Sequence, residues 1–118
     1  MRSDKNTIGL TEANKSVIEH VTTELGWFRT QIDAGKFALA LAIDREVPPG
    51  EVEGAGTVWN VGSFDSTNEL RDLLRILYPD WDGPYRLAEH FINRGLEIIG
   101  KEIEKHPHID ISHFLLTP

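Results

Sequence analysis

The stretch Phe37-Ala38-Leu39-Ala40-Leu41-Ala42-Ile43 contains seven consecutive apolar residues, and no other apolar run in the chain exceeds three. Its alternating large and small side chains leave no polar face, so a helix here is expected to be buried on all sides. The covering surface must come from the rest of the chain or from a second copy of it. The sequence therefore predicts that this helix is the packing centre of the fold.

Two helices are predicted in the first half of the chain, over about residues 30–44 and 11–25. Thr30-Gln31-Ile32-Asp33 fits a capping box with Asp in place of Glu, and Pro48-Pro49-Gly50 ends the first of them. The other helix has Thr11 as its N-cap and Gly26 just beyond its end. Its polar face includes Asn14, and its expected apolar stripe comprises Ala13, Val17, Ile18, Val21 and Leu25.

Two further helices are predicted in the second half, over about residues 66–78 and 84–105. Ser66-Thr67-Asn68-Glu69 is a capping box, and Pro84 suits the first position of a helix. The stripe of the third helix comprises Leu70, Leu73, Leu74 and Leu77. The apolar side of the fourth comprises Leu87, Ala88, Phe91, Ile92, Gly95, Leu96, Ile99 and Ile103, with Glu89 and His90 on a solvated face.

Two short strands, over about residues 6–10 and 57–61, complete the prediction of a mainly α fold. The second strand is expected to pair with the first, or with its own copy in a dimer. The tail from residue 106 to 118 is expected to dock as a strand or an irregular arm. Residues 46–56 are rich in Pro, Gly and Glu, and they are the best candidate hinge within a single domain of residues 1–118. This connector separates a strand-helix-helix unit from a C-terminal helical pair.

The composition of the 118 residues is that of a globular protein, with 40% hydrophobic and 26% charged side chains. No apolar run approaches the ~20 residues needed to cross a bilayer, and the polar N-terminus does not resemble a signal peptide. With no cysteine in the chain, a cytoplasmic location is expected. Residues 46–118 carry six basic and thirteen acidic side chains, which accounts for the whole net charge of −7. A DNA-facing surface is therefore permitted only in the neutral N-terminal third.

Thr7-Ile8-Gly9-Leu10-Thr11-Glu12, followed by Gly26 and Thr30, resembles the ribbon-helix-helix domain of small bacterial repressors and antitoxins. The resemblance implies a homodimer whose paired strands enter the major groove of duplex DNA and whose second helices pack together. It also implies that Lys5, Thr7 and Gly9 face the bases, and that Arg29, Thr30 and Gln31 lie near a phosphate. Gly9 departs from the pattern because it has no side chain with which to read a base edge. Asn6 stands where the family usually has an apolar residue.

Two groups of residues consist of amino-acid types that are common in metal sites or catalytic sites. His106, His108, Asp110 and His113 are metal-ligand types, but they lie on a proline-broken tail, so an exposed polar segment is favoured and metal binding stays open. Asp80-Trp81-Asp82 places two carboxylates beside an aromatic ring, but these residues also suit a turn between two helices. No phosphate-binding loop or nucleophile elbow occurs. The sequence thus predicts a non-enzymatic protein with no cofactor.

Five aromatic residues lie in or beside turns and short strands, where covering the core is favoured over forming an interface. They are Trp27, Phe28, Trp59, Trp81 and Tyr85. The residues expected at an interface are Phe37, Leu39, Leu41, Trp59 and Trp81. The sequence favours a dimeric DNA-associated regulator or accessory factor. The alternative is a protein–protein adaptor or assembly component that uses the acidic, aromatic C-terminal half.

Overall fold

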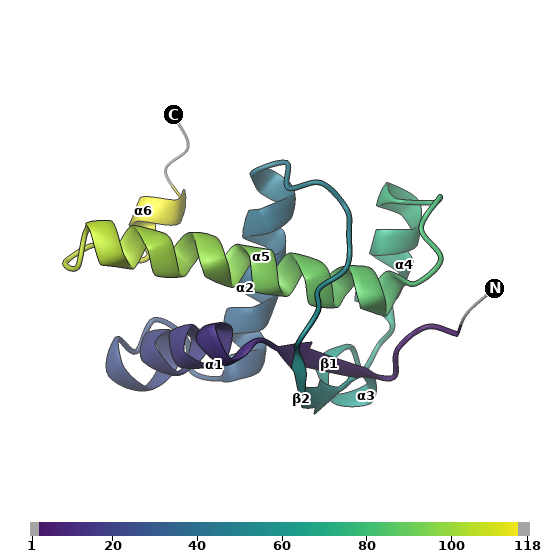
Figure 1. The fold of residues 1–118 in the computed structure, drawn as a ribbon, viewed down its shortest axis with the longest axis horizontal. Helices are drawn as coiled ribbons and strands as arrows, with labels where there is room; N and C mark the ends of the chain where they lie inside the picture. Colours follow the sequence, from purple (N-terminus) through teal and green to yellow (C-terminus); the bar gives the residue numbers. More distant parts are fainter. Residues whose placement is uncertain (1–2, 116–118) are drawn as a thin grey trace.

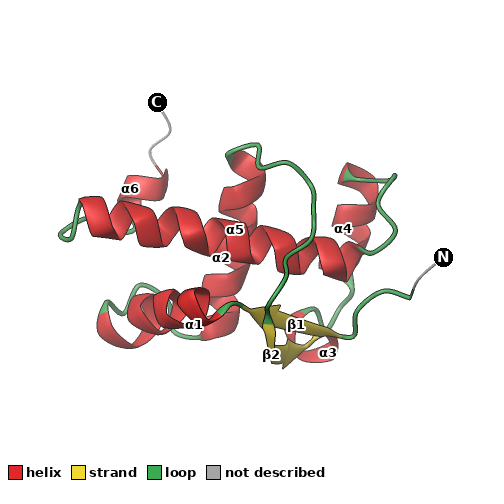
Figure 2. Cartoon of the chain, in the orientation of Figure 1, coloured by secondary structure: helices red, strands yellow, loops and turns green. Residues whose placement is uncertain are grey.

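The computed structural model describes residues 3–115 as a mainly helical fold with one small antiparallel sheet (Figure 1, Figure 2). This confirms the predicted fold class. The elements are β1 (Thr7–Leu10), α1 (Glu12–Glu19), the π-helical turn η1 (His20–Glu24), α2 (Gln31–Asp44), β2 (Gly56–Asn60), α3 (Val61–Phe64), α4 (Glu69–Leu77), α5 (Pro84–Lys105) and α6 (Ser112–Leu115).

The long helix α5 runs through the middle of the molecule, and α2 crosses it steeply (Figure 1). The two backbones touch at Gly95, where an added Cβ would lie only 1.9 Å from the carbonyl oxygen of Ala38. The apolar run on α2 is therefore covered by a helix of the same chain. It is not buried on all sides, however, because Ala40 is exposed on the face turned away from α5.

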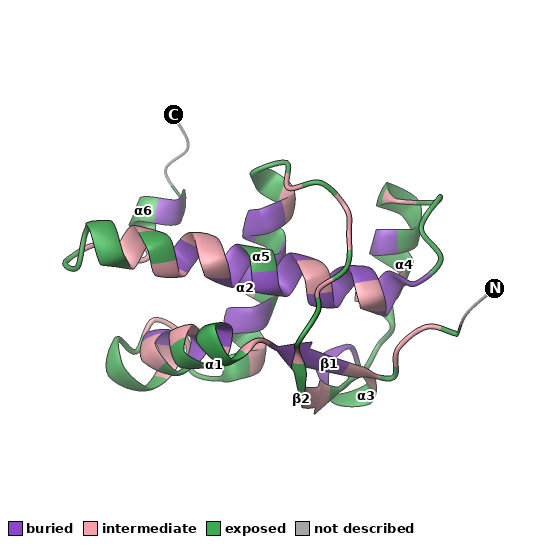
Figure 3. Ribbon diagram, in the orientation of Figure 1, coloured by how far each residue is buried: buried purple, intermediate pink, exposed green. Residues whose placement is uncertain are grey.

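One hydrophobic core draws residues from every helix and from β1, on both sides of the connector 46–56 (Figure 3). Its fully buried large side chains are Ile8, Leu10, Ile18, Val21, Phe64, Leu74, Leu87, Phe91, Ile92, Leu96 and Ile99. The predicted N-terminal unit and C-terminal helical pair thus share the same core.

The connector crosses the surface of α5 and is held there by two side chains of that helix (Figure 1). His90 Nε2 lies 2.9 Å from the carbonyl oxygen of Pro48, and Arg86 Nε lies 3.2 Å from a carboxylate oxygen of Glu51. Arg86 also donates to the carbonyl oxygen of Ser3, at 2.8 Å. The segment expected to be a hinge is therefore fastened to the central helix.

The two strands pair antiparallel within the chain, with Thr7 opposite Asn60 and Leu10 opposite Gly56. A β-bulge lies between Ile8 and Gly9. The backbone of β2 passes so close that a Cβ on Gly9 would lie 2.8 Å from the carbonyl oxygen of Gly56. The glycine that departs from the ribbon-helix-helix pattern is thus required by the packing of this sheet.

A network of buried polar side chains lies beneath β1, and two of its members were predicted to be solvated. Asn14 and Glu89 were both expected on solvated helix faces, but their exposed fractions are 1% and 2%. Asn14 donates to the side-chain oxygen of Asn93, at 2.9 Å, and Glu89 accepts from the amide of Gly9, at 2.8 Å. These groups are buried because they satisfy one another and the backbone of β1.

The tail also differs from its predicted strand or irregular arm, because residues 112–115 form the helical turn α6. Phe114 is buried, and its ring lies 6.0 Å from that of Trp27 and 6.4 Å from that of Phe37. A single aromatic anchor thus docks the tail on α2 and the turn before it. Leu116 to Pro118 lie outside the described residues.

Candidate functional site

Helix α4 presents large apolar side chains to solvent. The exposed fractions are 48% for Leu73, 76% for Ile76 and 47% for Leu77, and Trp81 in the following turn is 38% exposed. The helical spacing i, i+3, i+4 places the first three on one face. We call these four residues the α4 surface. Leu73 and Leu77 were expected in the buried stripe of this helix, so the structure corrects that prediction.

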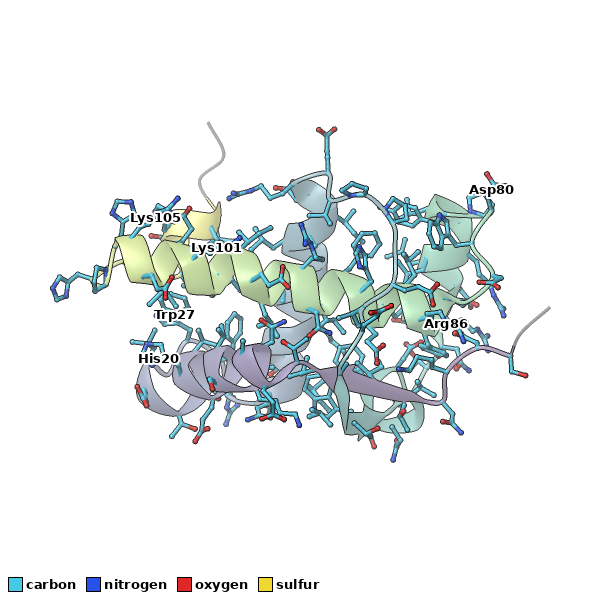
Figure 4. The ribbon with its side chains drawn as sticks, in the orientation of Figure 1. His20, Trp27, Asp80, Arg86, Lys101 and Lys105 are labelled. Atoms are coloured by element: carbon cyan, nitrogen blue, oxygen red, sulfur yellow. The ribbon has the colours of Figure 1, made fainter. Side chains whose placement is uncertain are left out.

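The adjoining face of α4 packs on α5. Leu74 is 1% exposed, and the ring of Tyr78, just past the helix end, lies 5.3 Å from that of Phe91. Helix α4 stands at one end of the molecule and is largely exposed (Figure 3), and Asp80 in the turn after it lies at that same edge (Figure 4). Its apolar residues therefore divide between an inner face, which anchors the helix, and an outer face, which is uncovered.

The N-terminus of α4 is capped by Asp65, which corrects the predicted capping box at Ser66–Glu69. Asn68 adopts a left-handed conformation with φ of 63° and makes no side-chain cap. The Asp65 carboxylate instead accepts hydrogen bonds from the amides of Leu70 and Arg71, each at 3.0 Å. This carboxylate also accepts from the hydroxyl of Tyr85, at 2.7 Å, which ties the cap to α5.

The cap changes the ionisation of both side chains. Burial acts to raise the pKa of Asp65, but hydrogen bonds from Tyr85, Leu70 and Arg71 outweigh it and hold that pKa below its usual value. Burial and the neighbouring carboxylate raise the pKa of Tyr85 to about 12. At neutral pH the pair is therefore a carboxylate and a neutral phenol, the forms that suit this hydrogen bond.

Replacing Tyr85 with phenylalanine is expected to lower the free energy of unfolding by about 2 kcal/mol at pH 7, because a hydrogen bond to a buried carboxylate is lost. The pKa of Asp65 is lower in the folded than in the unfolded chain, whose value is about 3.9. The stabilisation from ionised Asp65 is thus fully present above that pH and is lost as the pH falls further. Urea unfolding at pH 7 and pH 3 should show the difference between wild type and Y85F narrowing at pH 3; a constant difference would contradict this account.

The residues expected to contact DNA have different surroundings from one another. Lys5 Nζ lies 2.6 Å and 2.8 Å from the two carboxylate oxygens of Glu89, and the Thr7 hydroxyl is 3.5 Å from that of Thr57. Gly9 is buried. The residues expected near a phosphate, Arg29, Thr30 and Gln31, are exposed, and the Thr30 hydroxyl accepts from the amide of Asp33 at 3.0 Å.

Both edges of β1 are used within the chain. One edge pairs with β2, and on the other the Gly9 amide donates to Glu89 while the Gly9 carbonyl accepts from Asn93, at 3.0 Å. A second copy of β1 would have to displace one of these partners in order to form an intermolecular ribbon. The geometry therefore offers no free strand edge at this position.

Most of the residues expected at an interface lie against the core of the single chain. Leu39 and Leu41 are each 5% exposed, and the ring of Phe37 lies 5.2 Å from that of Phe28. The ring of Trp59 lies 5.0 Å from that of Phe64. Trp81 is the exposed member of the set, and it belongs to the α4 surface.

The histidine-rich tail forms a small polar cluster. His113 Nε2 lies 3.1 Å from a carboxylate oxygen of Glu102, and the rings of His106 and His113 are 6.0 Å apart. Within residues 3–115, no group of three or more His, Cys, Asp or Glu side chains is arranged to hold a metal ion.

In the same part of the chain, no helix has both the length and the apolar character needed to cross a membrane.

Ile76 is the most exposed apolar residue of the site, and no motif in the sequence marks it. The available signal is its spacing: Leu73, Ile76 and Leu77 form an apolar stripe beside the one that contains Leu70 and Leu74. A helix with two apolar faces can bury only one of them against a single partner helix.

Comparison with family models, with curated proteins and with solved structures finds no match to this chain.

Proposed function

We propose that this protein is a non-enzymatic adaptor or assembly component that binds a partner protein through the α4 surface. The observation that supports the proposal is the exposure of Leu73, Ile76, Leu77 and Trp81 at one end of the fold. Soluble proteins rarely expose large contiguous apolar patches, and such patches often mark protein interaction sites. Trp is also among the residue types enriched at interaction hot spots.

The contacts that hold α4 in place agree with a role of its outer face in binding a partner. Its inner face is anchored by Leu74, and the Asp65 carboxylate fixes its first turn. A helix held in this way loses little conformational freedom when a partner covers its outer face, which lowers the entropic cost of binding. The partner is a protein with a complementary apolar groove or helix, because apolar side chains at helical positions i, i+3 and i+4 bind to surfaces of that kind.

Replacing Ile76 with glutamate is expected to abolish partner binding without unfolding the protein. At 76% exposure the side chain contributes little to the folded state, so the free energy of unfolding should change by less than about 1 kcal/mol. The matched control is Leu115→Glu, which makes the same apolar-to-acidic change at another exposed site. The tagged full chain is isolated from its source cells under mild conditions, and associated proteins are quantified by mass spectrometry.

A specific protein retained by wild type and L115E but lost with I76E and with Trp81→Ala would support the proposal. Equal recovery with all four proteins would place the interface elsewhere. The absence of any protein enriched with wild type would count against an adaptor.

The DNA-associated function remains a prediction of the sequence with a separate test. Lys5 is already paired with Glu89, and the geometry leaves Arg29 and Gln31 as exposed candidates for a phosphate contact. If the α4 surface carries the function, duplex DNA should not be retarded by the protein in a low-salt gel-shift series. Retardation that weakens with salt and is lost on Arg29→Ala would instead favour the DNA-binding alternative.

A further inference from the structure

A concave surface lies between α1–η1 and the C-terminal half of α5. It is an open groove of about 610 Å³. Figure 4 shows His20 and Lys101 on the helices that form its two sides. The lining includes Ala13, Val17 and His20 from α1 and η1, and Gly100, Lys101 and Ile103 from α5. We call this surface the α1–α5 groove.

The floor of the groove is made of residues whose periodicity predicted a place in the core. Ala13 is exposed, and Val17 and Ile103 are only half-buried, although all three belong to the apolar stripes of their helices. Gly100 lies between them without a side chain, and an added Cβ there would lie 2.9 Å from a methyl carbon of Val17. The apolar stripes of α1 and α5 thus meet at Val17 and Gly100, and the parts of these stripes that stay uncovered form an apolar trough.

The π-helical turn η1 forms one end of the wall. It follows directly on α1 and spans His20–Glu24. Such turns are uncommon, and many occur at functional sites. Here the widened turn carries both His20 and Glu24 on the groove, with His20 Nδ1 at 2.6 Å from a carboxylate oxygen of Glu24.

The rim of the groove is acidic. It carries three carboxylates, on Glu24, Glu97 and Glu104, against one ammonium, on Lys101. Within the described residues, Glu97 contacts Arg94 at 3.3 Å across one helical turn, and all of these groups face water. An apolar floor bordered by excess negative charge is complementary to an apolar ridge bordered by positive charge.

The geometry points to the α1–α5 groove as a second binding site, which takes a basic amphipathic helix of a partner protein. Two helices with an uncovered apolar floor between them form the receptor of a helix-in-groove interaction, and anchors at i, i+3 and i+7 would lie along that floor. The inference deepens the proposed adaptor function and rests on it, since an adaptor needs a surface for each of two partners. The α4 surface and the groove lie towards opposite ends of α5, whose 22 residues span roughly 33 Å.

Synthetic 18-residue helical peptides made of leucine and lysine provide the probe. One peptide has the two residue types arranged amphipathically, a second has the same composition in scrambled order, and a third has glutamate in place of lysine. Binding to the ¹⁵N-labelled full chain is followed by chemical-shift changes and by fluorescence anisotropy at low and high salt. The amphipathic Leu/Lys peptide is expected to bind with a 1:1 ratio, to shift residues in ranges 13–24 and 97–104, and to bind more weakly at high salt.

The variant Glu97→Lys/Glu104→Lys is expected to lower the affinity for this peptide at least tenfold. The matched control, Glu53→Lys/Glu69→Lys, makes the same charge change at exposed positions away from the groove and should lower it less than threefold. Equal losses in the two variants, equal binding of the scrambled or acidic peptide, or no binding at all would each overturn the proposal. Shifts that appear on raising the concentration of the protein alone would assign the groove to a second copy and would overturn it as well.

The variant I76E separates this inference from the proposed function. It should bind the Leu/Lys peptide as wild type does, because the α4 surface is not part of the groove. If I76E keeps the cellular partner but loses the peptide, the assignment of the two surfaces fails. If the peptide binds in the groove while no partner depends on Ile76, the groove stands and the α4 proposal fails.

Discussion

Replacing Gly95 with alanine is expected to lower the free energy of unfolding by about 3 kcal/mol, since an overpacked core cannot relax around a backbone clash. The added Cβ would lie 1.9 Å from the carbonyl oxygen of Ala38, on the backbone of the helix that crosses α5. No side-chain rotation relieves such a contact, so α2 and α5 must separate. The higher helix propensity of alanine, worth about 1 kcal/mol, offsets only part of this cost.

Gly62→Ala is the matched control, because it adds the same methyl group to the short helix α3. There the new Cβ would lie 3.5 Å from the side-chain oxygen of Asn60, which is an ordinary contact. Chemical denaturation of both variants, followed by circular dichroism, should show a large shift of the midpoint only for G95A. A G95A protein as stable as wild type would mean that the two helices do not cross at Gly95.

The second large effect is expected from Asn93→Ala, which should lower the free energy of unfolding by about 4 kcal/mol. Asn93 is fully buried, and its side chain accepts from the Thr11 amide and the Asn14 amide group and donates to the carbonyl oxygens of Gly9 and Glu89. Truncation leaves several of these groups buried without a partner. Each unsatisfied buried polar group costs about 1–3 kcal/mol, which exceeds the worth of the hydrogen bond itself.

The control for this variant is Asn6→Ala, at an exposed asparagine whose backbone carbonyl, not its side chain, accepts from Val61. Its free energy of unfolding should stay within about 0.5 kcal/mol of wild type. Amide hydrogen exchange gives a second measurement, since the Thr11 amide loses its acceptor in N93A and should lose protection first. Unchanged protection at this amide would show that water or a neighbouring group replaces the lost partner.

The helices and strands were largely predictable because their signals are local. The boundaries of α2 and α5 follow from a threonine cap and from proline at the first helical position, which act within one turn. Which faces of the helices are buried was less predictable, because burial depends on the elements that pack against each face. Asn14 and Glu89 look solvated in isolation. Glu89 is buried because it accepts from the Gly9 amide of β1, and Asn14 is buried because it donates to Asn93 on α5.

The residues of the candidate site also divide into those that a local sequence signal indicates and those whose exposure depends on packing. Trp81 was identified from the sequence because an aromatic residue in a turn is conspicuous, but Ile76 was not, because its exposure depends on how little of α4 rests on α5. The cap of α4 was misplaced for a related reason. Asp65 lies outside the predicted motif and reaches the helix only because the Tyr85 hydroxyl and two backbone amides meet at its carboxylate.

The attachment of β1 to α5 also determines when the chain can fold during synthesis. Its backbone bonds reach Asn60, about fifty positions later, and the Glu89 and Asn93 side chains, 80 and 84 positions after Gly9. A ribosome must therefore release β2 and the first half of α5 before the first strand has both of its partners. Until then at least one edge of this strand is open to other chains, which is a state in which aggregation can begin. Folding of this protein is thus a late event that depends on its longest helix, and contacts this distant in sequence slow it further.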